Sequence, residues 1–209
     1  MNEVVIFGAA SGLGLAMVKY FTRKGVSVVG VARNVENNEL ATLCNKTYQC
    51  DATDKAQVLS VVKSLSKDAI VISTMGSFRA DVPVDYLGHR HLIDALESAE
   101  IKRFLLVTSL GCGDSWQYLS QRSKTGFGKA VREKSLAESY LQTSHLDFTI
   151  LRPGGLKDGT VTETGKLSQD KEVHGFIYRE EVARLVDVLL RQSESVKQIF
   201  ACVDPNLTH

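Results

Sequence analysis

The chain has 209 residues, 44% of them hydrophobic and 23% charged, and a formal net charge of +1 at pH 7. This length fits one domain with a full hydrophobic core. The near-neutral charge excludes the basic surface of a nucleic-acid binder or of a protein held to an anionic membrane, and no apolar run reaches bilayer length. The four cysteines have no CxxC spacing, so we expect no metal site, no disulfides and a reducing, cytoplasmic compartment.

Apolar runs typical of buried strands alternate with helical patterns along the chain. The runs predict strands at residues 4–7, 26–31, 48–50, 69–73, 103–109, 147–151 and 198–203. Apolar spacing predicts helices at 15–22, 54–67, 86–99, 127–143 and 180–191, and a short helix within 36–47. This alternation predicts an α/β fold, a doubly wound Rossmann-type parallel sheet in a single domain, 1–209. Substrate-side loops are expected around 75–85, 110–126 and 154–175.

The first strand is followed by GAASGLG, residues 8–14, with three glycines in seven residues. Gly8 permits a tight turn, Gly12 lets the backbone approach a pyrophosphate, and Gly14 lets the next helix pack close to the strand. A plain tight turn does not explain three glycines. Between a strand and a helix, the stretch therefore predicts a dinucleotide site made by Gly8, Ala10, Ser11, Gly12, Leu13 and Gly14.

The end of the second strand indicates which dinucleotide binds. An acid at this point holds the ribose 2′-hydroxyl of NAD, whereas an arginine accommodates the 2′-phosphate of NADP. In VSVVGVARN, Arg33 stands here, and no acid follows before Glu36. We therefore predict NADP, with Ser11 and Asn34 as further hydrogen-bonding groups. An ordinary solvated surface charge is the alternative for Arg33.

Several stretches together resemble a known family. They are GAASGLG, VGVARN, CDATD at 50–54, VISTMG at 71–76, LLVTS at 105–109, KSLAES at 134–139 and LDFTILRPGGL at 146–156. In these motifs the chain is similar to the atypical short-chain dehydrogenases/reductases. Within them it is most similar to the NmrA-like proteins, which include biliverdin-IXβ reductase, also known as NADPH-dependent flavin reductase. The resemblance extends from Val4 to about Val203.

The resemblance implies that segments following several strands line the cofactor. The residues are Asp51 and Ala52 at the adenine ring, Ser73, Thr74, Met75 and Gly76 at the ribose, and Arg152, Pro153 and Gly154 at the nicotinamide. It also implies that Ser109 takes the place of the family's active-site serine or threonine, and that Lys134 holds the nicotinamide ribose. For Asp51, a purely local cap of its loop is the alternative.

One position departs from the wider superfamily. Its usual members carry a proton-donating tyrosine four residues before the lysine, and here that position is Ala130. Reduction of an ordinary carbonyl needs a positioned acid. Hydride transfer to a flavin or a bilin spreads the charge over a conjugated system, and water can supply the proton. The sequence therefore predicts an NADPH-dependent reductase of a conjugated acceptor, either a flavin or a tetrapyrrole such as a bilin.

Two other functions stay open. One is a redox-sensing regulator that binds NADP without turnover, and the other is an oxidoreductase or isomerase of a specialised metabolite, with Tyr118 or His174 as its acid. Loop residues expected to contact the substrate are Phe78, Leu110, Trp116 and Tyr118, although core packing explains Trp116 nearly as well. The chain has no clear apolar seam for pairing, so we expect a monomer whose partner is a small molecule.

Overall fold

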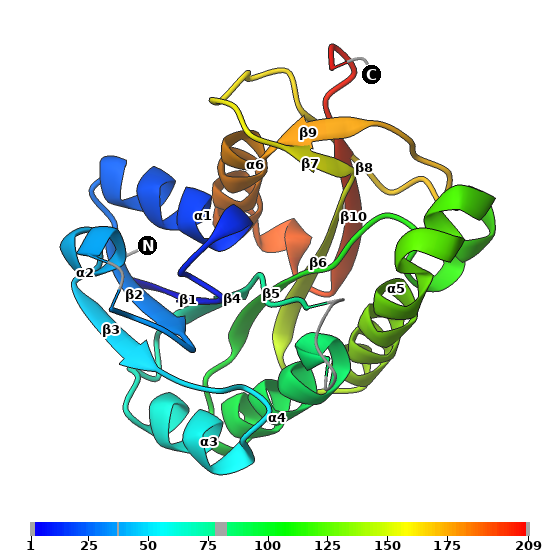
Figure 1. The fold of residues 1–209 in the computed structure, drawn as a ribbon. Helices are drawn as coiled ribbons and strands as arrows, with labels where there is room; N and C mark the ends of the chain where they lie inside the picture. Colours follow the sequence, from blue (N-terminus) through cyan, green and yellow to red (C-terminus); the bar gives the residue numbers. More distant parts are fainter. Residues whose placement is uncertain (1–2, 37, 78–82, 208–209) are drawn as a thin grey trace.

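An eight-stranded sheet runs through the molecule, with its strands in the order β3-β2-β1-β4-β5-β6-β10-β8 (Figure 1). The computed structural model describes residues 3–36, 38–77 and 83–207. The strands of this sheet are β1 (Glu3–Phe7), β2 (Ser27–Ala32), β3 (Lys46–Gln49), β4 (Ile70–Ser73), β5 (Arg103–Val107), β6 (Asp147–Pro153), β8 (Lys166–Ser168) and β10 (Gln198–Val203). A separate pair joins β7 (Gly155–Lys157) to β9 (Phe176–Tyr178). The helices are α1 (Gly12–Arg23), α2 (Asn38–Leu43), α3 (Lys55–Lys63), α4 (Val84–Ser98), α5 (Gln121–Gln142) and α6 (Arg179–Arg191), with the 3₁₀-helices η1 (Gly113–Tyr118) and η2 (Ser193–Ser195).

The strand order reverses between β1 and β4. From β1 the chain adds β2 and then β3 on one side, and it returns to add β4, β5 and β6 on the other. These neighbours all pair in parallel, so the predicted doubly wound Rossmann-type fold is confirmed. At one edge the short strand β8, which the sequence patterns do not predict, adds to β10 in the antiparallel direction.

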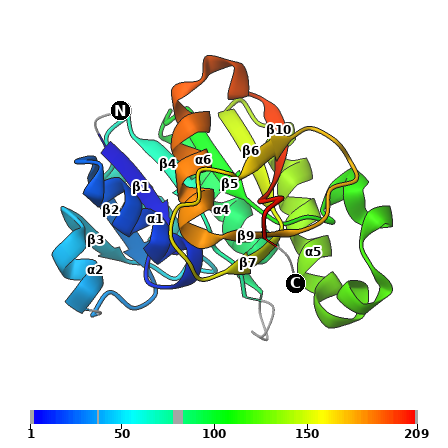
Figure 2. The ribbon, with the colours of Figure 1, turned by 90° about the horizontal axis from the view of Figure 1, so that it is seen from above.

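Helices cover both faces of the sheet (Figure 2). The core on one face contains side chains from α1, α2 and α6, and the core on the other contains side chains from α3, α4 and α5. β1 illustrates why a continuous apolar run forms such a strand. Val4 and Ile6 belong to the first core, whereas Val5 and Phe7 belong to the second, so every side chain of this run is buried.

Two helices begin three or more residues earlier than the sequence patterns predict. α1 begins at Gly12 rather than at residue 15, inside the glycine-rich turn. α5 begins at Gln121 rather than at residue 127, because the Ser120 hydroxyl caps it by accepting a hydrogen bond from the Ser123 backbone N–H at 3.1 Å. The first turns of α5 are polar and mostly exposed, so they lack the apolar periodicity that marks a helix. The expected loop 110–126 is therefore largely helical.

The segment 154–175 is more regular than the expected loop. It contains β7 and β8, whose three residues each are too few to show strand alternation in the sequence. The buried carboxylate of Glu181, on α6, accepts backbone hydrogen bonds from Thr162, Glu163 and Gly165. These contacts fix the segment to the start of α6.

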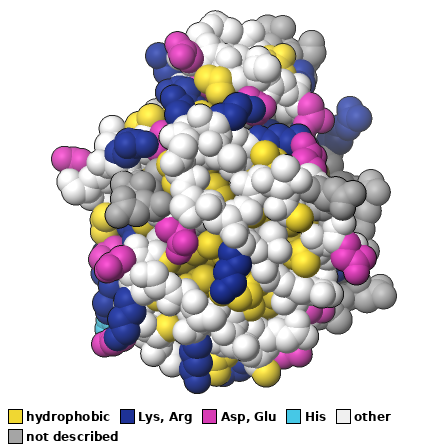
Figure 3. All heavy atoms as spheres, turned by 90° about the vertical axis from the view of Figure 1, so that its left-hand side faces the viewer, with side chains coloured by type: hydrophobic (Ala, Val, Ile, Leu, Met, Phe, Trp, Pro, Cys, Tyr) yellow, Lys and Arg dark blue, Asp and Glu magenta, His cyan; other side chains and the backbone are white. Residues whose placement is uncertain are grey.

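The face at the β3 edge carries acidic and basic side chains interspersed among hydrophobic ones (Figure 3). This mixture agrees with the formal net charge of +1. Among the helices of the described ranges, none combines the length and the apolar character needed to cross a membrane.

Candidate cofactor site

The carboxyl ends of β1, β2 and β4 meet where the strand order reverses (Figure 1). The backbone N–H of Gly8 donates to the Val31 carbonyl at 2.9 Å, and that of Thr74 donates to the Phe7 carbonyl at 3.0 Å. The segments after these strands are thereby held together at one edge of the sheet. In an open parallel sheet this crevice is the usual ligand site.

The glycine-rich turn after β1 excludes side chains at two positions. Gly8 has a φ of +86°, and a Cβ there would lie 2.9 Å from Thr74 Oγ1. A Cβ on Gly14 would collide with the Gly8 carbonyl oxygen. These two positions therefore need glycine for the tight turn and for the close approach of α1, as GAASGLG predicts.

The start of α1 is suited to an anion. Ser11 precedes the helix, is exposed, and makes no capping hydrogen bond through its side chain. The first turn, which includes Gly12 and the buried Leu13, carries no acidic residue to oppose the positive end of the helix dipole. Ala10 is half-buried in the turn. A phosphate group fits this combination of helix end and glycine-rich backbone.

Arg33 and Asn34 follow β2, and both are exposed at the same edge of the sheet. The Asn34 side-chain oxygen accepts a hydrogen bond from the Glu36 backbone N–H at 2.9 Å. Asn34 therefore shapes its own turn, whereas the Arg33 guanidinium faces solvent. That exposed position is compatible with a 2′-phosphate.

Asp51 lies after β3 and forms local hydrogen bonds. Its carboxylate accepts from the backbone N–H of Thr53 at 2.9 Å and from the Thr53 hydroxyl at 2.8 Å. These two bonds lower the pKa of Asp51, and Arg33 contributes less. The sequence analysis left two roles for Asp51, contact with the adenine ring and a local cap of its loop, and the structure displays the local cap. Ala52 is buried beside it.

A polar network that the sequence analysis missed lies beneath the loop after β4. His89 Nε2 is 2.9 Å from the Ser73 hydroxyl, and His89 Nδ1 is 2.6 Å from the Asp85 carbonyl oxygen. The Asp85 carboxylate lies 2.7 Å from Lys134 Nζ, which also donates to the Met75 carbonyl at 3.2 Å. The Ser73 side chain is therefore committed to the interior, and Lys134 is fixed beside the loop. Asp85 and His89 are four residues apart on one helix, a spacing that signals a shared face.

The network also positions the loop backbone. Ser77 N–H donates to the Asp85 carboxylate at 2.9 Å. A Cβ on Gly76 would lie 3.0 Å from Lys134 Nζ, so the loop and the ammonium group are in close contact. The Thr74 hydroxyl donates to the Phe7 carbonyl at 3.2 Å, which ties β4 to the end of β1. The Thr74 side chain thus joins the two strands.

Ser109 lies two residues beyond β5 and is half-buried. Its hydroxyl is 3.6 Å from the Cys112 sulfur, and the Cys112 thiol donates to the Val131 carbonyl at 3.6 Å. Burial raises the pKa of Cys112, so the thiol keeps its proton. The neighbour of Ser109 is therefore a neutral thiol, rather than a base of the kind that activates a serine nucleophile.

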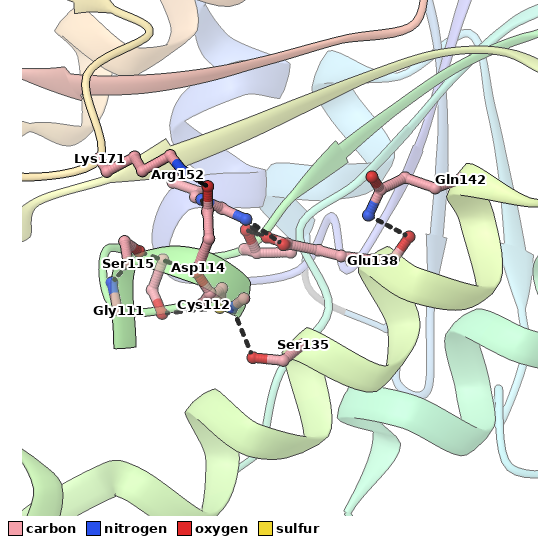
Figure 4. A network of polar contacts seen from close by, with 12 residues as sticks. Gly111, Cys112, Asp114, Ser115, Ser135, Glu138, Gln142, Arg152 and Lys171 are labelled. Atoms are coloured by element: carbon pink, nitrogen blue, oxygen red, sulfur yellow. Dashed lines mark hydrogen bonds and ion pairs between the residues drawn. The ribbon is translucent and has the colours of Figure 1, made fainter. Parts of the chain in front are cut away.

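A second buried network surrounds Arg152 (Figure 4). The Arg152 guanidinium contacts both carboxylate oxygens of Glu138, at 3.1 and 2.6 Å, and it donates to Asp114 at 2.8 Å. Glu138 also accepts from the Thr108 hydroxyl at 2.6 Å. Burial acts to lower the pKa of Arg152, but the hydrogen bonds with Glu138 outweigh it and raise that pKa above its ordinary value. Arg152 therefore joins β6, α5 and η1.

The strand β6 extends through Arg152 and Pro153, so these residues do not follow the strand as the sequence analysis expects. The Pro153 carbonyl accepts from Leu110 N–H at 3.0 Å, and Gly154 N–H donates to the Cys202 carbonyl at 2.9 Å. The role of Glu138 was missed, although its position one helical turn after Lys134 in KSLAES places the two on the same side of the helix.

The residues expected to contact the substrate that the structure describes have different surroundings. Phe78 lies outside the described residues. Leu110 and the Arg152 side chain line a small cavity of about 70 Å³. Trp116 packs on α5. A Cβ on Gly128 of that helix would lie 3.1 Å from the Trp116 ring. Tyr118, in η1, is half-buried.

Trp116 also borders a groove of about 400 Å³ along the outer side of α5. The other lining residues are Lys124, Gly128, Lys129, Arg132, Glu133 and Leu136. The Lys124 ammonium lies 5.4 Å from the centre of the Trp116 ring. The ring thus contacts both α5 and the groove, and its role at the substrate stays a prediction.

The residues at the reversal point fit a dinucleotide. The turn at Gly8 and Gly14 brings backbone to the surface without side chains, α1 opens without an acidic group, and Lys134 projects beside the loop after β4. Together the fold and this edge define a Rossmann-type nucleotide-binding protein of the short-chain dehydrogenase/reductase class.

Comparisons with known proteins agree with this class. A model of the NAD(P)H-binding family matches residues 8–193. The chain is 42% identical to a solved structure, ChuY, an anaerobillin reductase from Escherichia coli O157:H7; the match covers 100% of both chains with a TM-score of 0.91. It is 27% identical to the UPF0659 protein C216.03 of Schizosaccharomyces pombe, over 99% of this chain and 92% of that protein. A short-chain dehydrogenase/reductase from Veillonella parvula, in complex with NADP, is 13% identical, with 100% and 97% coverage and a TM-score of 0.79, and it shares the fold.

The chain belongs to the NAD(P)H-binding family, as an atypical short-chain dehydrogenase/reductase of the biliverdin-reductase-like kind. The family resemblance drawn from the sequence motifs is thereby confirmed. The protein is an oxidoreductase, similar to reductases, that binds a nicotinamide cofactor.

Proposed function

We propose that this protein is an NADPH-dependent reductase that transfers a hydride to a conjugated acceptor, a bilin or a flavin. The observation that carries the proposal is Ala130, which is buried one helical turn before Lys134, where the usual members of the superfamily have a tyrosine. A site without that acid suits an acceptor whose conjugated system takes up the charge. The full-length similarity to a protein described as an anaerobillin reductase favours a bilin.

Lys134 holds the cofactor ribose in this proposal. Its ammonium group stays in place because the Asp85 carboxylate and the Met75 carbonyl bind it from below, at 2.7 and 3.2 Å. The ammonium is thus held within the protein by an ion pair and a hydrogen bond, and its remaining donors can bind ribose hydroxyls. When bound, the reduced nicotinamide supplies the hydride, and the protein's contribution is to stack the acceptor against it.

Ser109 orients the acceptor through a hydrogen bond. Its neighbour, Cys112, is a neutral thiol and takes no proton from it at neutral pH. We therefore assign the proton to water and give Ser109 a positioning role. The two groups proposed as alternative acids have other surroundings: Tyr118 is half-buried in η1, and His174 is exposed beside Glu172, with 3.3 Å between His174 Nε2 and the carboxylate.

Arg33 supports the preference for NADPH. It is exposed at the end of β2, where the 2′-phosphate lies in folds of this class, and its guanidinium can bind a phosphate through two parallel hydrogen bonds. The cytoplasmic location and the monomeric state stay predictions.

The first experiment measures oxidation of NADPH and NADH by the purified protein with biliverdin, FMN, FAD or riboflavin as acceptor. We expect turnover with NADPH and at least one of these acceptors, and slower turnover with NADH.

Replacing Arg33 by Gln should lower kcat/KM for NADPH about tenfold or more, because the variant loses a hydrogen bond to a charged group. The kcat/KM for NADH should stay nearly unchanged.

Other outcomes separate the remaining functions. Binding of NADP without reduction of any acceptor would contradict the proposal and favour a redox-sensing regulator. A large loss of rate in Tyr118→Phe or His174→Gln would reveal a local proton donor, and would favour an oxidoreductase or isomerase of a specialised metabolite.

A further inference from the structure

Arg179 contains a buried hydrogen-bond donor that lacks an acceptor. Arg179 is the first residue of α6, and its Nη1 donates to the Asp158 carboxylate at 2.7 Å. Its Nε is buried and has no hydrogen-bond partner in the part of the chain that the structure describes. An unsatisfied buried donor is costly, and the cost is larger for a charged group. Such an atom in a native structure calls for an explanation.

The unsatisfied atom lies beside the glycine-rich turn. A Cβ built on Gly12 would be 4.0 Å from Arg179 Nε. Gly12 is the first residue of α1, whose first turn carries no acidic side chain. The guanidinium and the amide end of α1 therefore approach the same space, and both favour an anion there.

The ion pair with Asp158 leaves Arg179 free to bind something else. The Asp158 side chain is 94% exposed, so its attraction for the guanidinium is weakened by water and contributes little to stability. A ligand phosphate can accept from Nε and share or replace the contact at Nη1. The planar guanidinium is suited to such two-point binding.

We propose that Arg179 is a phosphate-binding residue that holds the pyrophosphate of the dinucleotide against the start of α1. The inference rests on the nicotinamide cofactor of the proposed function, and it adds a contact from the opposite end of the chain to the glycine-rich turn. Its target differs from that of Arg33. The pyrophosphate is common to NADPH and NADH, whereas the 2′-phosphate is present in NADPH alone.

The test measures dissociation constants for NADPH and NADH by calorimetry, with the wild type and three arginine variants. Arg179→Gln should weaken both dinucleotides by the same factor, about tenfold to a hundredfold, which is the range for a hydrogen bond to a charged group. Arg33→Gln should weaken NADPH alone. Arg23→Gln is the matched control, because Arg23 also forms an ion pair with the start of α6, at 2.7 Å from Glu180. This variant removes one positive charge, as Arg179→Gln does, and it should change neither dissociation constant.

A fourth variant tests whether Arg179 acts directly. Asp158→Asn removes the charged partner of Arg179 and leaves the guanidinium in place. We expect this variant to bind both dinucleotides as tightly as the wild type or more tightly. A loss equal to that of Arg179→Gln would instead mean that the ion pair merely shapes the site, and it would overturn the proposal. Urea unfolding of each variant confirms that the binding constants compare folded proteins.

Three further results would overturn the inference. They are unchanged affinity in Arg179→Gln, a loss no larger than that of Arg23→Gln, and a loss confined to NADPH. Failure of the proposed function is visible separately, because it concerns reduction of the acceptor. A wild type that binds both dinucleotides but reduces nothing still tests Arg179, whereas a wild type that binds neither overturns both proposals.

Discussion

A single buried histidine orders the polar groups beneath the loop that follows β4. His89 Nδ1 lies next to the Asp85 carbonyl, which can only accept, so Nδ1 carries the ring proton and Nε2 accepts from the Ser73 hydroxyl. Burial lowers the pKa of His89 to about 4, and the charge of Lys134 adds to this effect. The imidazole is therefore neutral at pH 7, and the direction of every hydrogen bond in the network is fixed.

This neutrality predicts how stability depends on pH. The unfolded chain takes up a proton on His89 near pH 6.5, whereas the folded protein does so only near pH 4. Stability from this source is complete above pH 6.5 and declines as the pH falls toward 4, by about 3 kcal/mol. Urea unfolding of the wild type and of His89→Gln at several pH values measures it. The variant should show a shallower decline below pH 6.5, and identical slopes would contradict the assignment.

At the scale of elements, the pair formed by Arg152 and Glu138 joins a strand to a helix. Their side chains are 8% and 1% exposed, and Asp114 extends the contact to η1. A Cβ on Gly113 would lie 2.7 Å from the Arg152 guanidinium, so the 3₁₀-helix packs directly on the pair. The position of η1, and with it the loop that follows Ser109, therefore depends on this network.

Removing one member of the pair leaves a buried charge. We expect Glu138→Ala to lower the free energy of unfolding by about 3–5 kcal/mol, because Arg152 loses its buried carboxylate. The control is Lys67→Ala, which removes an exposed ion pair with Glu100 and should cost far less. Chemical denaturation measures both. Equal losses would mean that the buried pair has no special role.

At the scale of the whole molecule, the cofactor edge brings together residues that are distant in the sequence. The glycine-rich turn follows β1 and Arg33 follows β2, so both lie at one edge because parallel strands end on the same side. Lys134 reaches this edge from α5, where it contacts the loop after β4. A ligand that binds this edge contacts several elements at once. Its binding must therefore stabilise the complete fold.

This linkage is measurable by thermal unfolding. With NADPH at a hundred times its dissociation constant, we expect a gain of about 2.7 kcal/mol, or a rise in Tm of about 5–10 °C for a protein of this size. NADH at the same concentration should give a smaller rise. In Arg33→Gln the two cofactors should give equal rises, and a persisting difference would contradict the role of Arg33.

The sequence by itself determined the fold class and the family. Buried parallel strands need continuous apolar runs, and the turn at Gly8 and Gly14 needs residues without a Cβ, so local chemistry marks both. Short elements were harder to predict. The strands β7, β8 and β9 have three residues each, and the first turns of α5 are polar, so neither shows a periodic pattern.

Only the tertiary structure decided which polar side chains meet. Nothing local in the sequence pairs Glu138 with Arg152, joins Asp85 to Lys134, or places Arg179 beside Gly12. Each contact links two different elements, which for Asp85 with Lys134 and for Arg179 with Gly12 lie far apart along the chain, and its geometry follows from how helices pack on a sheet. A motif records what one backbone segment needs for its own conformation, whereas charge pairs across a core depend on packing that no single segment contains.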